Sequence, residues 1–302
     1  QPDAAVPITK LLGRRMKQLE IIAADRASGA RTMTGYPTGV EKLDEKLGGV
    51  QPGIATIVAA RPGMGKSSLG LSIADGSSAA GFGVHLFSIE DTEESYADRT
   101  ISRMSRVPAE SMRNADLNVE QCRDIARTMH TTAGRRWLVD GRSGVTAAEI
   151  VRSVRRHKRA NQTVVVIVDY IQLVKRATWM QRASTHEVLT DAIMTFADAA
   201  KHDRIAYVVM SQLNREIEKR TDKRPQLADL RESGSLEERS KCVIGVYRGS
   251  VYGSPQKGID FDPSWKSRQH APSEYDFERE VQLCVIKNSN GRTGTVWADW
   301  HG

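Results

Sequence analysis

The sequence predicts an α/β protein with a mostly parallel central sheet flanked by helices and an antiparallel hairpin at its C-terminal end. Apolar runs alternate with segments of helical spacing, and several runs are rich in Val and Ile without polar alternation, as buried parallel strands tend to be. A glycine-rich segment, residues 60–68, lies between the first run and a helical segment. The last two runs flank a turn sequence at residues 288–292. The predicted strands are 54–60, 84–89, 137–140, 164–169, 205–211, 242–247, 281–287 and 294–300.

Residues 1–34 are predicted to form a linker segment, separate from a main domain at residues 35–302. Apolar residues recur at helical spacing from Ile8 to Ile22, which predicts an amphipathic helix that ends near Ser28. A Gly-Tyr-Pro-Thr-Gly sequence then marks the start of the main domain. The pattern leaves two interpretations open: the helix packs on its own domain, or it docks on a neighbouring subunit.

Composition limits the class of protein more than it identifies a function. The 302 residues suffice for a full α/β core, and 44 Lys and Arg against 37 Asp and Glu give a net charge of +7, which suits a polyanionic partner but is weak evidence for one. Cys122, Cys242 and Cys284 form no disulfide pattern, which favours a reducing compartment. No apolar run approaches the roughly 18 residues of a membrane span. We therefore expect a cytoplasmic protein without membrane contacts.

The glycine-rich segment, Ala-Arg-Pro-Gly-Met-Gly-Lys-Ser-Ser, has the sequence and the strand–loop–helix context of a phosphate-binding loop. Backbone N–H groups of such a loop and of the following helix N-terminus converge on phosphate oxygens. Lys66 is then within reach of the β- and γ-phosphates of ATP, and the Ser67 hydroxyl completes the shell of a Mg²⁺ ion. Ala60 stands where the strict pattern has glycine. The predicted nucleotide-binding residues are Arg61, Pro62, Gly63, Met64, Gly65, Lys66, Ser67 and Ser68.

Three polar residues that follow other predicted strands are candidates for the catalytic chemistry, because ligands bind at the carboxyl ends of strands in open parallel sheets. Asp169 ends a Val-rich strand and is placed to support Mg²⁺ through the water shell of the ion. Tyr170 occupies the position where many such ATPases carry a catalytic glutamate, so Glu90, which follows another strand, is the candidate for activating water. Its neighbour Asp91 is interpreted as an acid in the first turn of the next helix. Gln212 also ends a strand and is the candidate sensor of the γ-phosphate.

Two long polar connections stand out from the alternation of strands and helices. Residues 213–240 are dense in charge, and residues 252–279 are rich in Pro, Gly, Ser and Asp. Connections of this length are usually functional or disordered. From composition alone, residues 213–240 are best interpreted as a solvated charged loop.

With these positions in place, the chain resembles the C-terminal motor domain of the bacterial replicative hexameric DNA helicases, the DnaB-like family with a RecA-like P-loop ATPase core. The resemblance extends from Tyr36 to Thr295. Its longest and most specific part is residues 222–237, which a generic nucleotide-binding protein is not expected to carry. The matching segments are residues 60–68, 87–90, 168–173, 211–215 and 222–237.

The resemblance implies an ATP-dependent DNA helicase that forms a hexameric ring, hydrolyses ATP at subunit interfaces and translocates on single-stranded DNA to unwind the duplex. It implies that Lys66 and Ser67 bind phosphate and Mg²⁺, that Asp169 supports the metal, and that Glu90 activates water. Gln212 is implied to couple the nucleotide state to DNA. The loop that lines the central channel and grips the single-strand backbone corresponds to Arg231, Glu232, Ser233 and Gly234.

The resemblance also bears on partners and on the first residues of the chain. The helix predicted near the N-terminus resembles the family's linker helix, which docks on the adjacent motor domain and helps to close the ring. The family has a separate N-terminal domain, used for collar formation and primase contact, which we expect to be either removed from this sequence or naturally absent. A primase or a loader protein is the further partner that the family implies.

One departure from the family concerns the residues that reach the neighbour's γ-phosphate. The last strand of the family usually presents Lys and, two residues later, Arg; here Lys287 is present but position 289 is Ser. An arginine supplied in trans is worth roughly 10³–10⁵ in the rate of phosphoryl transfer. Our hypothesis is that Arg292, across the turn, takes this role. Lys287 alone in a slower motor, or poor hydrolysis, are the alternatives, and the departure suggests a divergent phage or mobile-element branch.

Two other functions keep the same nucleotide site. A RecA-type DNA-binding ATPase would remodel strands without unwinding them, and residues 222–237 argue against it. A ring with weak hydrolysis would act as a DNA clamp or assembly platform, and Ser289 is the feature that favours it.

Overall fold

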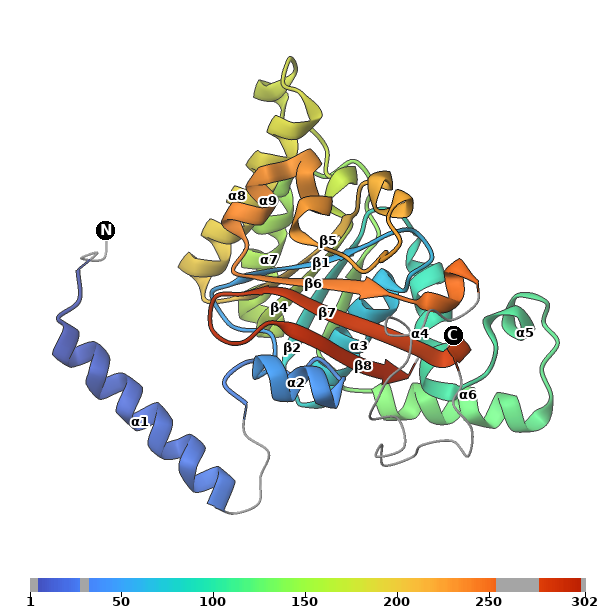
Figure 1. The fold of residues 1–302 in the computed structure, drawn as a ribbon. Helices are drawn as coiled ribbons and strands as arrows, with labels where there is room; N and C mark the ends of the chain where they lie inside the picture. Colours follow the sequence, from blue (N-terminus) through green and yellow to red (C-terminus); the bar gives the residue numbers. More distant parts are fainter. Residues whose placement is uncertain (1–4, 28–32, 254–276, 300–302) are drawn as a thin grey trace.

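One eight-stranded sheet forms the centre of the molecule (Figure 1), in a computed structural model that describes residues 5–27, 33–253 and 277–299. Its strand order is β3-β2-β4-β5-β1-β6-β7-β8. The strands are β1 (Ala55–Ala60), β2 (Gly83–Ser88), β3 (Trp137–Asp140), β4 (Thr163–Asp169), β5 (Ala206–Gln212), β6 (Cys242–Tyr247), β7 (Glu280–Asn288) and β8 (Gly294–Asp299).

Neighbouring strands from β3 to β6 run parallel, and β7 and β8 extend the sheet with antiparallel pairings. The predicted fold class and the C-terminal hairpin are therefore confirmed, and each predicted strand is found close to its predicted bounds. The register determines where the site lies. Ala60 pairs with Gln212, and Ser88 pairs with Asp169, so the carboxyl ends of β1, β5, β2 and β4 meet at one edge of the sheet.

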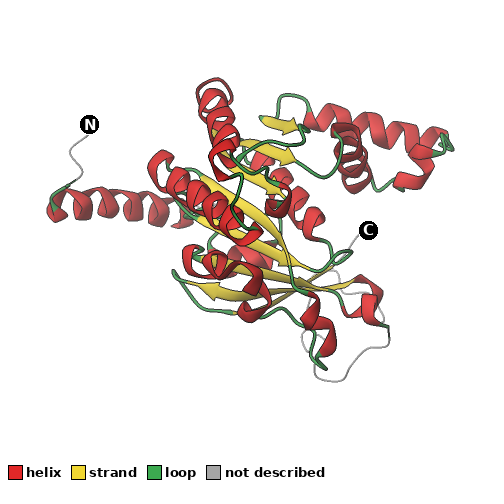
Figure 2. Ribbon diagram, turned by 90° about the horizontal axis from the view of Figure 1, so that it is seen from above, coloured by secondary structure: helices red, strands yellow, loops and turns green. Residues whose placement is uncertain are grey.

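Helices cover both faces of the sheet (Figure 2). Helix α3 packs on one face, where its Leu69 and Ile73 join an apolar cluster with Ile167. Helices α7 and α8 cover the opposite face, with Ile150 and Phe196 in a second cluster. The α-helices are α1 (Ile8–Ala27), α2 (Glu41–Leu47), α3 (Lys66–Ala79), α4 (Glu93–Ser105), α5 (Ala109–Arg113), α6 (Val119–Thr132), α7 (Ala147–Asn161), α8 (Thr185–Asp203) and α9 (Gly234–Arg239). The 3₁₀ helices are η1 (Ile171–Leu173), η2 (Thr178–Met180), η3 (Arg215–Lys219), η4 (Leu227–Ser233), η5 (Gly249–Tyr252) and η7 (Phe277–Arg279).

Several helices begin at side chains that cap their first turn. Thr92 accepts a hydrogen bond from the backbone of the first turn of α4. Asn118, Thr146 and Ser184 do the same for α6, α7 and α8, and each belongs to a capping box in which a Gln or Glu three residues later bonds back to the cap. Each such cap is worth about 1 kcal/mol, and together they determine where the chain turns into these helices.

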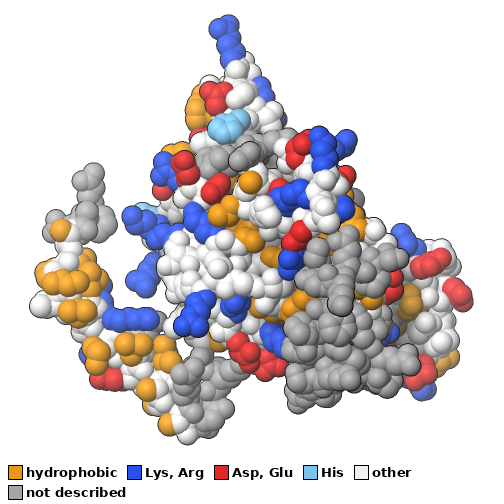
Figure 3. Space-filling model, in the orientation of Figure 1, with side chains coloured by type: hydrophobic (Ala, Val, Ile, Leu, Met, Phe, Trp, Pro, Cys, Tyr) orange, Lys and Arg blue, Asp and Glu red, His pale blue; other side chains and the backbone are white. Residues whose placement is uncertain are grey.

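Helix α1 stands apart from the sheet (Figure 1), and apolar side chains gather along its surface (Figure 3). Leu11, Leu12 and Met16 are 44%, 57% and 56% exposed. The predicted amphipathic helix is therefore present, but its apolar face is not buried against its own domain. Within the described ranges, no helix is long and apolar enough to cross a membrane.

Residues 213–240 are not the open charged loop that composition suggested. They contain η3, η4 and α9, and the apolar residues Ile217, Leu230 and Leu236 among them are buried in the core. These apolar positions are spaced too irregularly to show a helical or strand period in the sequence. Most of the second polar connection, residues 254–276, lies outside the described residues.

Candidate active site

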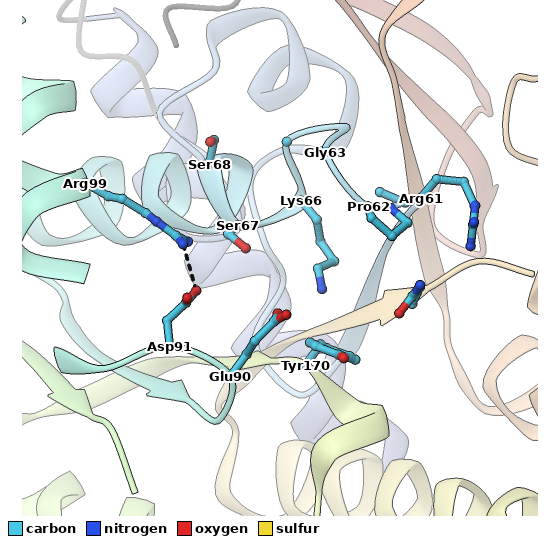
Figure 4. Close-up of a pocket in the computed structure, with 13 residues that line it drawn as sticks. Arg61, Pro62, Gly63, Lys66, Ser67, Ser68, Glu90, Asp91, Arg99 and Tyr170 are labelled. Atoms are coloured by element: carbon cyan, nitrogen blue, oxygen red, sulfur yellow. Dashed lines mark ion pairs between the residues drawn. The ribbon is translucent and has the colours of Figure 1, made fainter. Parts of the chain in front are cut away.

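A cavity of about 350 Å³ opens at the carboxyl edge of the parallel strands (Figure 4). The phosphate-binding loop forms one wall, and the segments that follow β2 and β4, the end of β5 and Arg99 of α4 form the rest. The lining residues are Ala60, Arg61, Pro62, Gly63, Gly65, Lys66, Ser67, Ser68, Glu90, Asp91, Arg99, Tyr170 and Gln212. All the predicted loop residues except Met64 therefore lie in one wall of this cavity; the Met64 side chain is 3% exposed and packs in the same apolar cluster as α3.

The loop that leads into α3 depends on two glycines with left-handed backbone conformations. Gly63 has a φ of 76° and Gly65 a φ of 98°, values that side-chain-bearing residues rarely adopt. Gly65 is the N-cap of α3, so the helix begins at Lys66 with its free N–H groups at the cavity. A helix N-terminus of this kind favours an anionic group.

Lys66 is held by two groups at the end of β4. Its ammonium lies 3.3 Å from Asp169 Oδ1 and 3.9 Å from the centroid of the Tyr170 ring. The other carboxylate oxygen of Asp169 accepts a hydrogen bond from the buried Tyr96 hydroxyl of α4. Burial and then the charge of Asp169 raise the pKa of Tyr96 well above its ordinary value, so the hydroxyl remains a donor. Sequence analysis did not identify Tyr96, because a tyrosine within a helix has no motif of its own.

The donor set at this position fits a hard cation such as Mg²⁺. Asp169 Oδ1 is buried and has no hydrogen-bond partner in the part of the chain that the structure describes, and Ser67 lines the cavity nearby. Within the same described ranges, no three His, Cys, Asp or Glu residues cluster as a complete metal site. An ion here would need phosphate oxygens and water as its remaining ligands, which is how Mg²⁺ is commonly bound.

Glu90 lies beyond the end of β2, and its side chain points toward the end of Lys66 (Figure 4). The next residue, Asp91, forms an ion pair with Arg99 of α4 at 2.9 Å inside the same cavity. The prediction that Asp91 belongs to the first turn of a helix is wrong: the N-cap is Thr92, and Asp91 precedes it. Arg99 was also missed. Arg99 could have been found from its place in the helix, because helical side chains point toward the helix N-terminus, which for α4 lies at the cavity.

The end of β5 is fixed by a side chain from the segment after β4. The Gln172 amide donates to Ser211 Oγ at 3.0 Å and to the Gln212 carbonyl at 3.1 Å, and it accepts from the Gln212 N–H at 3.2 Å. Two of these bonds hold the Gln212 backbone and the third holds the Ser211 hydroxyl, while the Gln212 side chain lines the cavity. Gln172 belongs to a segment that sequence analysis matched, but no role was predicted for it.

Lys287 and Arg292 do not line the cavity of their own chain. Lys287 of β7 donates a hydrogen bond to the Glu237 carbonyl of α9, and Arg292 is exposed at the β7–β8 turn. Ser289 donates through its backbone N–H to the Lys241 carbonyl at 2.8 Å. The predicted DNA-binding residues are Arg231, Glu232, Ser233 and Gly234. Their backbone forms the end of η4 and the start of α9, but their side chains are not among those that the structure describes.

Comparisons with known proteins agree with this architecture. The family model described as the DnaB-like helicase C-terminal domain matches residues 35–302. The replicative DNA helicase DnaB of Leifsonia xyli subsp. xyli is 31% identical over 300 residues, covering 98% of this chain and 60% of the relative. The corresponding protein of Pasteurella multocida is 33% identical over 258 residues, covering 83% of this chain and 54% of the relative. The chain thus spans little more than half the length of the curated relatives that it matches.

Two solved structures share the fold. The ATPase domain of a phage protein superposes with a TM-score of 0.78 at 23% identity, covering 94% of this chain and 95% of that domain. A DnaB-like replicative helicase, solved together with a study of its interactions with primase, gives a TM-score of 0.78 at 24% identity, covering 93% of this chain and 63% of that one.

Proposed function

The chain belongs to the family of DnaB-like helicase C-terminal domains, and we propose that it is the ATP-hydrolysing motor of a replicative-type DNA helicase. In this proposal it assembles as a ring, translocates on single-stranded DNA and unwinds the duplex ahead. The observation that supports it most is the cavity in which the phosphate-binding loop faces Glu90 and Gln212, beside the Lys66–Asp169 pair.

ATP is the proposed substrate, with its triphosphate along the loop of residues 61–68. The Lys66 side chain already lines the cavity. When phosphate binds, its ammonium would give up part of its contact with Asp169 and contact the β- and γ-phosphates instead. The first N–H groups of α3 add donors to the same oxygens. Glu90 would orient and deprotonate the attacking water, since its carboxylate forms no ion pair within the described residues and points toward Lys66 (Figure 4).

Ser67 and Asp169 are the residues proposed to hold Mg²⁺. The buried Oδ1 of Asp169 supports this assignment, because its one described partner is the Lys66 ammonium, at 3.3 Å, which is proposed to turn to the phosphates. When bound, the ion would neutralise charge on the phosphate oxygens. The Tyr96 hydroxyl keeps the Asp169 carboxylate in place by occupying its other oxygen.

The second half of the site would come from an adjacent subunit. Lys287 and Arg292 lie outside the cavity of their own chain, which is what residues acting in trans require. A head-to-tail contact that brings this hairpin to the next subunit's cavity generates a ring or a helical filament, and a homohexamer is the proposed form. Arg292 is proposed to replace the arginine that the family carries at position 289.

The DNA-binding residues are proposed to be Arg231, Glu232, Ser233 and Gly234. A basic side chain together with backbone groups binds the phosphate backbone without reading bases, as a translocating motor requires. Gln212 would report the state of the γ-phosphate to this segment, because it ends β5 at the cavity and the segment follows it along the chain.

We also propose that residues 1–34 form a linker and residues 35–302 the motor domain. The exposed apolar face of α1 supports docking of this helix on a neighbouring subunit. A primase or a loader protein is a further proposed partner.

The direct test is steady-state ATP hydrolysis by the full chain, with and without oligo(dT), together with displacement of a labelled strand from a forked duplex. Lys66→Ala removes the ammonium at the phosphates, and Lys201→Ala, on an exposed turn of α8, is the matched control. We expect DNA-stimulated hydrolysis and strand displacement in the wild type and the control. Both activities should fall by about 10²-fold or more in Lys66→Ala. DNA-independent hydrolysis, or hydrolysis that survives in Lys66→Ala, would contradict the proposal.

Ser289 favours one alternative, a ring with weak hydrolysis that serves as a DNA clamp or assembly platform. Such a ring, like a RecA-type ATPase that remodels DNA, would bind single-stranded DNA without displacing a strand. DNA-stimulated hydrolysis without strand displacement would favour the RecA-type ATPase, and DNA binding with negligible hydrolysis the ring.

A further inference from the structure

Arg61, the second residue of the phosphate-binding loop, lines the cavity and also contacts the segment that follows β5. Its side chain extends away from Lys66 (Figure 4). Its Nε lies 2.8 Å from Glu218 Oε1, and its Nη1 donates to the Leu213 carbonyl at 2.9 Å. The Arg61 side chain is only 11% exposed. The loop is thereby attached to the segment that leaves β5, at two points that belong to the chain beyond Gln212.

Glu218 lies in η3, and the chain that follows η3 is tied tightly to η4. Arg220 donates to both carboxylate oxygens of Asp229, at 3.0 and 2.8 Å, and to the Arg224 carbonyl at 2.9 Å. Asp229 is itself buried, and its Oδ2 also accepts from the Gln226 N–H at 2.8 Å. Glu218 is therefore two residues from Arg220, which is bonded to Asp229, and Asp229 lies two residues before the proposed DNA-binding residues.

A third element, η5, lies close to the Arg61–Glu218 ion pair through its Tyr252 side chain. Burial, and then the charge of Glu218, raises the pKa of Tyr252 in η5, and Arg61 opposes this shift, so the phenol lies within the field of both groups. The Lys223 ammonium lies 5.2 Å from the centroid of the Tyr252 ring. Lys223 belongs to the same segment as Asp229. Tyr252 thus lies near both the Arg61–Glu218 pair and Lys223, which belongs to residues 222–237.

We propose that the Arg61–Glu218 ion pair couples the phosphate-binding loop to the DNA-binding segment, with Glu218 acting as a positioning residue through Arg61. The inference rests on the proposed function and deepens it. In this proposal, phosphate binding shifts the phosphate-binding loop and therefore Arg61. Because Arg61 is paired with Glu218, η3 moves with it, and so does η4, which Arg220 holds through Asp229. Because coupling between two binding sites is reciprocal, DNA that orders this segment favours one position of the loop in return. The Arg61–Glu218 contact does not involve Gln212, whose backbone is held by Gln172.

The chain offers a matched control in the same short helix. Glu216 lies in η3, is an exposed acid, and forms an ion pair with Lys219 at 2.7 Å, but within the described residues it makes no hydrogen bond or ion pair with the phosphate-binding loop. Glu216→Ala and Glu218→Ala therefore remove the same charge from the same helix. Both acids are substantially exposed, at 64% and 47%, so neither substitution removes a core contact.

The experiment measures the affinity of the full chain for a fluorescent, non-hydrolysable ATP analogue with and without saturating oligo(dT). The ratio of the two affinities is the coupling factor, and the affinity for labelled oligo(dT) with and without nucleotide must give the same factor. We expect Glu218→Ala to lower this factor by about three- to tenfold, within the typical range of coupling between sites, and Glu216→Ala to leave it within about twofold of the wild type. Glu218→Gln, which keeps the size and one acceptor, is expected to fall between Glu218→Ala and the wild type.

Each outcome decides one question. A wild-type chain with no coupling between nucleotide and DNA overturns the proposed function, and this inference with it. Coupling in the wild type that Glu218→Ala preserves overturns this inference and leaves the proposed function standing. An equal loss in Glu216→Ala and Glu218→Ala also overturns it, because the effect would then come from the charge of η3 and not from Arg61. Circular dichroism of each variant confirms that the fold is intact.

Discussion

The two sides of the proposed ATP site are built in different ways. On the phosphate-binding side, Lys66, Asp169 and Tyr96 are connected within one chain, and the last two are buried. On the other side, Arg292 stands exposed at a hairpin turn and Lys287 bonds to a carbonyl of its own chain. The parallel part of the sheet assembles its half during folding. The antiparallel part offers residues that, in the proposed function, only a second copy of the chain can use.

The two halves of the site are also expected to differ in stability. Groups buried between strands lose their partners only at a large cost, so the phosphate-binding half is expected to be present in every state of the protein. Lys287 and Arg292 make no ion pair with a buried charged group among the described residues, so in the proposed function their position depends on the neighbour. The proposed ring would change the activity of a site by moving one subunit against the next.

The largest expected effect is a fall in the free energy of unfolding at low pH, which tests whether β2 on the phosphate-binding side is enclosed in the core. His85 of β2 is buried next to Phe87 and His157, and burial, then the nearby His157, lowers its pKa from 6.5 to about 4. The unfolded chain therefore takes up a proton between pH 6.5 and 4 that the folded chain does not. Stability should fall as the pH is lowered through this window, by about 3 kcal/mol from this residue.

Urea unfolding at pH 7 and at pH 4.5 measures this difference. In His85→Gln, which cannot take up the proton, the loss between the two pH values should be correspondingly smaller. His130→Gln, at an exposed position of α6, is the control and should keep the wild-type dependence. Equal pH dependence in all three proteins would show that His85 titrates normally and is not enclosed as the structure indicates.

The next effect concerns the link between α4 and Asp169. Tyr96→Phe removes the hydroxyl that donates to the buried carboxylate but keeps the ring. A buried charged acceptor left without its donor should lower the free energy of unfolding by about 2 kcal/mol. Denaturant unfolding at pH 7 measures it, with Tyr36→Phe as the reference, since the Tyr36 hydroxyl makes no hydrogen bond with the described residues. A loss no larger than that of Tyr36→Phe would show that the bond contributes little.

The smallest effect probes the incomplete half. If Arg292 replaces the missing arginine, Arg292→Ala should lower DNA-stimulated hydrolysis by about tenfold, equal to about 1.4 kcal/mol in the barrier. This is less than the roughly 10³–10⁵ of a full arginine finger, because Lys287 remains to neutralise charge. Ser289→Arg restores the family's residue and should raise the rate of the Arg292→Ala protein. Unchanged turnover in Arg292→Ala would assign the role to Lys287 alone.

The sequence predicted one half of this comparison much better than the other. The Val- and Ile-rich runs and the glycine-rich loop are local signals, so the parallel strands and the cavity wall of residues 61–68 followed from them directly. Glu90 and Gln212 also reached the cavity, because the carboxyl ends of parallel strands meet at one edge.

The contacts that join distant segments could not be predicted in the same way. Tyr96 meets Asp169 across 73 residues, and Arg61 meets Glu218 across 157, so neither pair leaves a periodic pattern. Asp91 was predicted to lie inside the first turn of α4, but the helix is capped by Thr92 and Asp91 lies before it. The short helices between residues 213 and 240 were missed since their buried apolar residues are few and irregularly spaced.

The most direct test of a divided site is complementation between two inactive proteins. Lys66→Ala disables the phosphate-binding half, and the double variant Lys287→Ala with Arg292→Ala disables the other. Hydrolysis is measured with oligo(dT) for each protein alone and for an equimolar mixture, at a total concentration where the wild type is active. If adjacent chains share each site, the mixture should hydrolyse ATP faster than either protein alone, because some interfaces combine two intact halves. A mixture as inactive as its parts, with mixed assemblies shown by cross-linking, would contradict the account.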